Sequence, residues 1–242
     1  MSQQVKVDRD LEFRGVAAHT NNIVGNINPD KKYVSYDFTE LALDTTENYT
    51  QNIDTTSAIA LASGGVTLTT AVTDNKVCTQ AHGGIWWYPA KNPVTEMRFQ
   101  LDVVTTVAIF AGFSDAATEA SGTMPFALSV ATLTDTCSNG AGFLFDTDQT
   151  LDYWNCVNTK AGTQAFTQLA SSYVPAAGTD IVLRTVLDSD GNANFYYNGK
   201  HVHYKASAVT ANVPYIPFFG IKNMSAAAHV ATLKYVRCWQ DM

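Results

Sequence analysis

The sequence predicts an all-β protein, an antiparallel two-sheet sandwich with an extended N-terminal arm. Polar and apolar residues alternate over residues 96–103, the period-2 pattern of a strand with one buried and one solvent-facing side. Residues 107–113 are apolar enough for a strand that is covered on both sides. The pairs Asp190-Gly191 and Asn198-Gly199 separate further strand-like runs over 181–205. They favour two successive hairpins, because a type I′ turn needs positive φ at both central residues.

The bulk composition supports one large core. The chain has 242 residues, of which 46% are hydrophobic and 15% charged. A formal charge of −7 and a single adjacent basic pair, Lys31-Lys32, argue against nucleic-acid binding, which needs a concentrated basic surface. No apolar run approaches the ~20 residues of a membrane-spanning helix. The polar start, MSQQVK, lacks the apolar segment of a secretory signal, so synthesis in a cytoplasm is expected.

Residues 1–32 differ from the rest of the chain. They mix charges of both signs without a sustained period, so we predict an arm or linker, followed by one sandwich domain over 33–242. Leu11, Phe13 and Val16 are apolar enough to dock, either on a partner or on the chain's own domain.

The sandwich domain is rich in Thr, Val, Gly and aromatic residues, which are typical of strands and tight turns. Besides the segments above, strands are predicted at 33–38, 58–62, 66–72, 85–88, 142–146, 153–157, 218–221 and 231–240. Residues 116–140 are expected to form a long connection with a short helical turn near 117–120. No helix of three turns is predicted, and no internal repeat is evident.

The catalytic case is weak. Glycoside hydrolysis needs two carboxylates about 5–9.5 Å apart. The best candidate strand offers Glu96 and Asp102, which at ~3.3 Å per residue lie about 20 Å apart. The sequence also lacks Gly-x-Ser-x-Gly, His-Glu-x-x-His and a phosphate-cradling glycine loop. We predict no catalytic and no cofactor-binding residues.

Two kinds of residue cluster could in principle bind a metal. Asp146, Asp148 and Asp152 have carboxylates at calcium-like spacing, but they lack the glycine and terminal glutamate of an EF-hand loop. His201 and His203 would share one strand face without a third ligand nearby. A solvated turn and an ordinary sheet surface explain them better, so no metal site is predicted.

The cysteines and aromatic residues have simpler interpretations. Cys78, Cys137, Cys156 and Cys238 show no metal-ligand spacing, so free and mostly buried thiols are expected. Most aromatic rings should fill the core. One or two exposed rings, with Trp87 and Trp154 as candidates, could stack on a sugar or fill an interface.

The C-terminal segment Leu233-Lys234-Tyr235-Val236-Arg237-Cys238-Trp239-Gln240 resembles the closing strand of concanavalin-A-like, laminarinase-type jelly rolls. Residues 181–199 are similar to the paired strands that precede it in that fold. The Glu-x-Asp-x-x-Glu motif of the enzymes is absent, so their activity is not implied.

A further resemblance, from residue 36 onward, is to virion proteins of tailed phages with this fold. It is carried by Tyr36-Asp37-Phe38, IALASGGV at 59–66, Gly112-Phe113-Ser114-Asp115 and GFLFDTD at 142–148. It implies a non-enzymatic protein on the capsid surface that decorates or cements the shell, with the major capsid protein as partner and a homo-oligomer, such as a trimer, as the binding unit. The alternative from another class is a carbohydrate-binding or receptor-binding module that uses exposed aromatic residues.

Overall fold

A computed structural model of the chain describes residues 31–38, 43, 45, 48–120 and 123–242. Leu11, Phe13 and Val16 lie outside the described residues. The regular structure of the described part is strand, apart from two single-turn 3-10 helices, η2 (Pro89–Lys91) and η3 (Ser171–Tyr173). None of its helices is long and apolar enough to cross a membrane.

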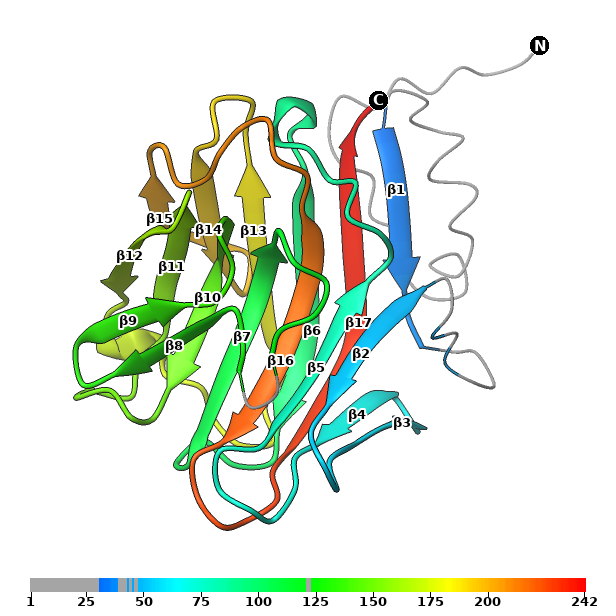
Figure 1. Cartoon of the computed structure of the whole chain (residues 1–242), viewed down its shortest axis with the longest axis vertical. Helices are drawn as coiled ribbons and strands as arrows, with labels where there is room; N and C mark the ends of the chain where they lie inside the picture. Colours follow the sequence, from blue (N-terminus) through cyan, green and yellow to red (C-terminus); the bar gives the residue numbers. More distant parts are fainter. Residues whose placement is uncertain (1–30, 39–42, 44, 46–47, 121–122) are drawn as a thin grey trace.

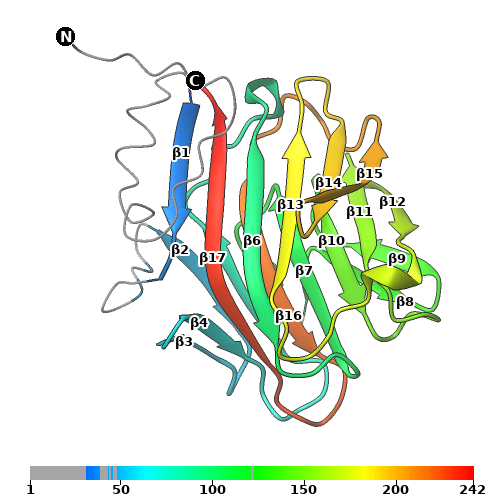
Figure 2. The same ribbon diagram turned by 180° about the vertical axis from the view of Figure 1, so that it is seen from behind.

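The predicted two-sheet antiparallel sandwich is confirmed (Figures 1 and 2). The eight-stranded sheet has the order β15-β14-β13-β6-β17-β4-β3, and β1 also pairs with β17. Its strands are β1 (Lys31–Tyr36), β3 (Ala58–Ala62), β4 (Gly65–Thr69), β6 (Val94–Leu101), β13 (Ile181–Leu187), β14 (Ala193–Tyr197), β15 (Lys200–Lys205) and β17 (Val230–Asp241).

The seven-stranded sheet has the order β12-β11-β10-β7-β16-β5-β2. Its strands are β2 (Tyr49–Ile53), β5 (Val77–His82), β7 (Val107–Ser114), β10 (Gly140–Asp146), β11 (Asn155–Lys160), β12 (Thr163–Gln168) and β16 (Ile216–Asn223). A separate hairpin of β8 (Phe126–Ser129) and β9 (Thr132–Asp135) lies against the outer side of this sheet, in front of it in Figure 1.

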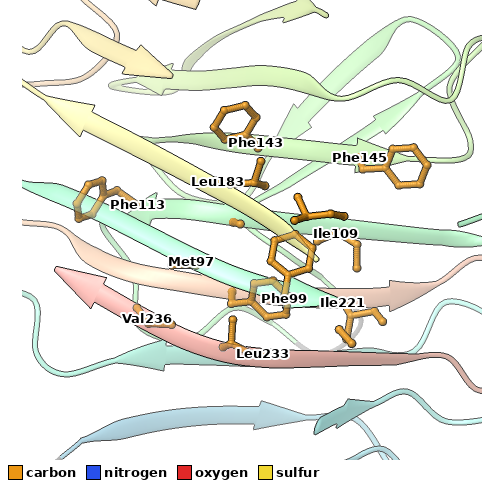
Figure 3. Close-up of a cluster of buried hydrophobic side chains, with 14 of the residues drawn as sticks. Met97, Phe99, Ile109, Phe113, Phe143, Phe145, Leu183, Ile221, Leu233 and Val236 are labelled. Atoms are coloured by element: carbon orange, nitrogen blue, oxygen red, sulfur yellow. The ribbon is translucent and has the colours of Figure 1, made fainter. Parts of the chain in front are cut away.

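The core between the sheets comes from the inward side chains of both. Figure 3 shows Met97 and Phe99 of β6 facing Ile109 of β7 and Ile221 of β16. The rings of Phe99 and Phe219 lie 5.0 Å apart between their centres. Burying each such side chain contributes about 1.5–3 kcal/mol. All four cysteines are free and buried, as expected.

Two central strands behave as their patterns predict. β6 buries Met97, Phe99 and Leu101, while Arg98 and Gln100 between them are partly exposed. β7 is buried along its whole length, because its outer side is covered by the β8–β9 hairpin. β6 and β7 belong to opposite sheets. The chain therefore crosses the core between them.

The prediction that residues 116–140 form a long connection with a short helical turn is wrong in part. This segment contains the β8–β9 hairpin, whose turn at Val130 and Ala131 has none of the glycine or asparagine typical of hairpin turns. β2, β5 and β12 were also not predicted. β1 begins at Lys31, so it includes the last two residues that the sequence assigned to the arm.

Candidate functional site

The outer face of the seven-stranded sheet is closed by protein. Its outward side chains form a second apolar cluster under residues 123–137, which we call the roof. The ring of Phe110 on β7 lies 5.2 Å from that of Phe126 in the roof. The cluster consists of Val77, Ala81, Ala108, Phe110, Leu144, Val157, Ile216 and Phe218 below, and of Met124, Phe126, Leu128, Leu133 and Cys137 above. The face that the roof covers is therefore a packing surface.

Two glycines allow the roof cluster to pack closely. A Cβ on Gly142 of β10 would come within 2.8 Å of the Phe110 ring, and one on Gly220 of β16 within 3.1 Å of the Met124 sulfur. These distances are shorter than ordinary van der Waals contact, so larger residues would push the aromatic rings and the roof outward.

The eight-stranded sheet faces the viewer in Figure 2, and its outer face has no such cover among the described residues. This face presents charged and aromatic side chains. Its centre is Glu96 of β6, opposite Arg184 of β13 and Arg237 of β17. Both Nε and Nη2 of Arg184 donate to Oε2 of Glu96, at 2.8 and 2.5 Å. The hydroxyl of Tyr235 donates to Oε1 at 3.0 Å. Burial, and then the adjacent Glu96 charge, raise the pKa of Tyr235 above its ordinary range, so the phenol remains a donor.

A row of rings and guanidinium groups crosses this face from β14 to β1. The Arg184 guanidinium carbon lies 5.8 Å from the centre of the Tyr196 ring and 5.5 Å from that of Trp239. The Trp239 ring is stacked against Tyr33 at 6.3 Å. We call Tyr33, Arg184, Tyr196 and Trp239 the arginine–aromatic strip. Within each strand, these residues point outward because side chains alternate between the two faces of a sheet. That they lie in one row across several strands depends on the register in which the strands pair.

Further cations flank the strip. Arg98 donates through Nε to Asp180 at 2.9 Å and through Nη2 to the same oxygen, and Lys234 lies 2.6 Å from the other carboxylate oxygen. Burial opposes ionisation of Asp180, but the hydrogen bonds from Lys234 and Arg98 outweigh it and lower the pKa of this carboxyl. The guanidinium of Arg237 lies 4.2 Å over the Tyr235 ring. Among the described residues, no carboxylate lies within ion-pair distance of Arg237.

The carboxylates of this face are not arranged for glycoside hydrolysis. Asp180 is level with Gln100, four residues along β6 from Glu96 and therefore about 13 Å away at ~3.3 Å per residue. Asp102, six residues along the chain from Glu96, is farther from Glu96 than Asp180 is. Both separations exceed the ~5–9.5 Å between carboxylates that retaining or inverting glycoside hydrolysis needs. Glu96 is also held by a cation and a phenol, so its role here is to order the strands around it.

The two tryptophans predicted to be surface rings are buried, which makes that prediction wrong. Trp87 is 1% exposed because it faces the core and pairs with Tyr215. Trp154 is fully buried against Phe99, Phe143 and Phe145. Neither ring can stack on a sugar.

The residue before Trp87, Trp86, carries the exposed ring of this pair and is 42% exposed. Its ring packs on the backbone of Gly84, where a Cβ would come within 2.7 Å of the ring. The ammonium group of Lys32 lies 4.1 Å from the ring centre.

The two histidines of β15 do not share a face. A register shift between Phe195 and Tyr196 places His201 opposite Tyr196 and His203 opposite Phe195, so the histidines point to different sides of the sheet. Among the residues that the structure describes, no group of three His, Cys, Asp or Glu side chains could hold a metal ion.

Asp146, the first of the three aspartates at calcium-like spacing, has a structural role. Asp146 is 2% exposed and accepts backbone N–H bonds from Leu128 at 2.9 Å and Asp148 at 3.0 Å. Burial raises the pKa of Asp146 to about 6, against the opposing effect of these two bonds. The carboxyl therefore fastens the roof to β10.

No protein-family model and no curated protein sequence matches the chain. Solved structures do match it. The catalytic domain of LamA from Zobellia galactanivorans superposes with a TM-score of 0.62 and 10% identity over 86% of this chain and 96% of that one. The β-glucanase of Bacillus licheniformis gives a TM-score of 0.56 and 12% identity over 87% and 98%. The fold is a concanavalin-A-like jelly roll.

A protein of unknown function from Shewanella oneidensis also matches, with a TM-score of 0.52 and 12% identity over 88% of this chain and 87% of that one. Such low identities establish the fold and leave the activity open. The predicted likeness to laminarinase-type jelly rolls is confirmed at the level of the fold. These structures do not indicate a virion protein.

Proposed function

We propose that the chain is a non-enzymatic virion component that binds the surface of a phage capsid as a decoration protein. The proposal that the protein is not an enzyme rests on what the outer faces of the two sheets present. The roof fills one of them, and on the other Glu96 and Asp180 are too far apart and are each engaged by cations. A jelly roll with these faces is suited to binding through its surface.

Support for the virion part comes from the sequence resemblance. Two of its segments, 112–115 and 142–148, lie on or directly after the adjacent strands β7 and β10, where Gly112 pairs with Gly142 beneath the roof. The resembling residues thus build the packing of the roof, and this packing gives a family of binding proteins a reason to share them without a catalytic motif.

In this proposal the protein is made in the host cytoplasm and then binds the assembled shell in many copies, as a homo-oligomer such as a trimer. The major capsid protein is the partner, and Leu11, Phe13 and Val16 of the arm provide the contact. A protein that binds only the assembled state stabilises that state by mass action. The net charge of −7 would keep a dense coat soluble.

The test is capture of partners from an infected lysate by the tagged full chain and by a chain lacking residues 1–30. The truncation ends before Lys31, because its ammonium group lies 2.5 Å from Asp241 and β1 pairs with β17. Recovery of major capsid protein by the full chain alone supports decoration through the arm. Recovery by both assigns the contact to the sandwich. Failure of both to bind purified capsids contradicts the proposal.

The second candidate is a carbohydrate-binding module. The observation that favours it is the loop before η2, in which Trp86 and Tyr88 are 42% and 40% exposed. A similar fold occurs in LamA solved with laminaritriose and laminaritetraose, with a TM-score of 0.62 and 8% identity. This candidate requires saturable binding of a β-glucan that is lost in Trp86→Ala. Equal retardation of wild type and Trp86→Ala in a laminarin-containing gel contradicts it.

A further inference from the structure

The acidic residues and the arginines of the chain are unevenly distributed. From residue 99 to residue 159 the sequence contains no lysine or arginine, and its seven acidic residues are Asp102, Asp115, Glu119, Asp135, Asp146, Asp148 and Asp152. This stretch forms β7, the roof and β10. By contrast, the three arginines among the described residues, Arg98, Arg184 and Arg237, all lie on the outer face of the eight-stranded sheet.

An exposed patch on the roof side combines acidic and apolar side chains. Val130, at the tip of the hairpin, is 65% exposed, and Leu151 is 48% exposed. The N–H of Val130 donates to the carbonyl of Asp148 at 2.8 Å, and its carbonyl accepts from Thr150 at 3.2 Å, so the hairpin tip is fastened to the loop after β10. Asp148 and Asp152 in that loop are both exposed. We call Val130, Asp148, Leu151 and Asp152 the acidic patch.

The arginine–aromatic strip and the acidic patch are chemically complementary. Tyr, Trp and Arg are the residues most enriched in the energetic centres of protein interfaces. A guanidinium group pairs well with a carboxylate, and exposed Val and Leu side chains offer apolar contact to the faces of Tyr and Trp rings. Within the part of the chain that the structure describes, Arg237 is the arginine that has no carboxylate partner, since Arg98 and Arg184 pair with Asp180 and Glu96.

The two surfaces lie on opposite sides of the sandwich. The hairpin that carries Val130 is in front of the seven-stranded sheet in Figure 1, and the eight-stranded sheet faces the viewer in Figure 2. One copy can therefore present both surfaces at the same time, but it cannot bring them together within itself.

We propose that copies of this chain associate head to tail, with the arginine–aromatic strip and Arg237 of one copy docked on the acidic patch of the next. This inference goes beyond the proposed capsid role, because it requires no other protein. The contact is heterologous, so it closes into a ring where the rotation between copies permits and otherwise continues as an open chain. A trimer, which the resemblance to virion proteins suggests, would be one closed form.

The test is sedimentation velocity of the full chain over a range of concentrations, at 20 mM and at 500 mM NaCl. Wild type is expected to form dimers and larger species at low salt. It should dissociate at high salt, where the Debye length falls to about 4 Å. Arg237→Glu and Asp148→Lys should each weaken association by at least about tenfold. Lys76→Glu, in the turn before β5, makes the same change in net charge as Arg237→Glu and should associate as wild type does.

A mixing experiment tests the head-to-tail geometry. Arg237→Gln retains its acidic patch and Asp148→Asn retains its strip, and neither introduces a charge that could pair with the other variant's altered surface, so an equimolar mixture should form a heterodimer that stops at two copies. Each variant must first match the thermal midpoint of wild type, and Arg237→Gln also replaces Arg237→Glu in the sedimentation test if the charge reversal fails to fold. A monomeric wild type at low salt, equal behaviour of Arg237→Glu and Lys76→Glu, or no heterodimer on mixing would each overturn the proposal.

Discussion

His82 should make the stability of this protein sensitive to acid. Its side chain lies in the core at β5, fully buried, with the rings of Tyr36, Phe38 and Tyr49 at 5.5, 6.0 and 5.7 Å from its own. Neither ring nitrogen has a hydrogen-bond partner among the described residues. Burial lowers the pKa of His82 from 6.5 to about 3, because the charged form has no acceptor to replace its hydration.

The direction in which pH changes the free energy of unfolding follows from proton linkage. Between pH 6.5 and about 3 the unfolded chain binds a proton at His82 that the folded chain does not, so acid favours unfolding. The free energy of unfolding should fall by about 1.4 kcal/mol per pH unit, or about 2.7 kcal/mol at pH 4.5.

Asp146 acts in the opposite direction. Its pKa rises from 3.8 to about 6 on folding, so between these values the folded chain binds the extra proton and gains stability as the pH falls. Between pH 6 and 4 the two contributions have similar slopes and opposite signs, so they partly cancel in wild type. The His82 contribution appears only by comparison with a variant.

The assay is urea unfolding of wild type, His82→Phe and the control His201→Phe at pH 7, 6, 5 and 4.5. Phenylalanine fills the same aromatic site without a titratable group. The stability of His82→Phe relative to wild type should increase by about 1.4 kcal/mol per unit below pH 6.5, whereas His201→Phe, exposed on β15, should show no such trend. A relative stability that stays constant from pH 7 to 4.5 would refute the reasoning, whatever its value at pH 7.

Three further predictions concern packing and charge. Phe126→Ala should cost about 3–5 kcal/mol in urea unfolding, since it empties the ring site under the roof. Arg184→Met should cost about 2–4 kcal/mol by leaving Glu96 buried without its cation, and adding Glu96→Met should recover part of that loss; equal stability of the single and double variants would contradict the pairing. Trp87→Ala should lower the thermal midpoint strongly, whereas Trp86→Ala should change stability by less than about 1 kcal/mol, and the reverse order would mean that the wrong ring has been assigned to the core.

The parts of the fold with explicit local signals were predictable. Asp190-Gly191 and Asn198-Gly199 mark the turns of two hairpins, as predicted. Asn198 and Gly199 both have the positive φ of a type I′ turn, whereas at the first turn only Gly191 does, so the expected turn type is wrong there. The β8–β9 hairpin carries no such signal, because its turn places Val130 at φ 56, a conformation that β-branched residues rarely adopt. A turn of this kind is stabilised by the surrounding contacts and is therefore invisible to local rules.

The candidate surface was predictable only in part. Alternation in β6 indicates that Arg98 and Glu96 share a face, but the alignment of Arg184, Trp239 and Tyr33 depends on how strands far apart in sequence are paired. For Trp86 and Trp87 alternation required opposite directions without saying which ring was buried. The answer came from the pairing of Trp87 with Tyr215, which no short-range pattern shows.

The order of the strands along the chain has a consequence for synthesis. β17 lies between β6 on one side and β4 and β1 on the other, and β16 lies between β7 and β5, so each sheet is completed by a strand that follows all its neighbours in sequence. The seven-stranded sheet cannot close until residue 223 has left the ribosome, and the eight-stranded sheet cannot close until residue 241 has done so. The nascent chain therefore carries unpaired strand edges throughout its translation, and it folds afterwards in a reaction dominated by distant contacts, which makes it slow and dependent on protection from aggregation.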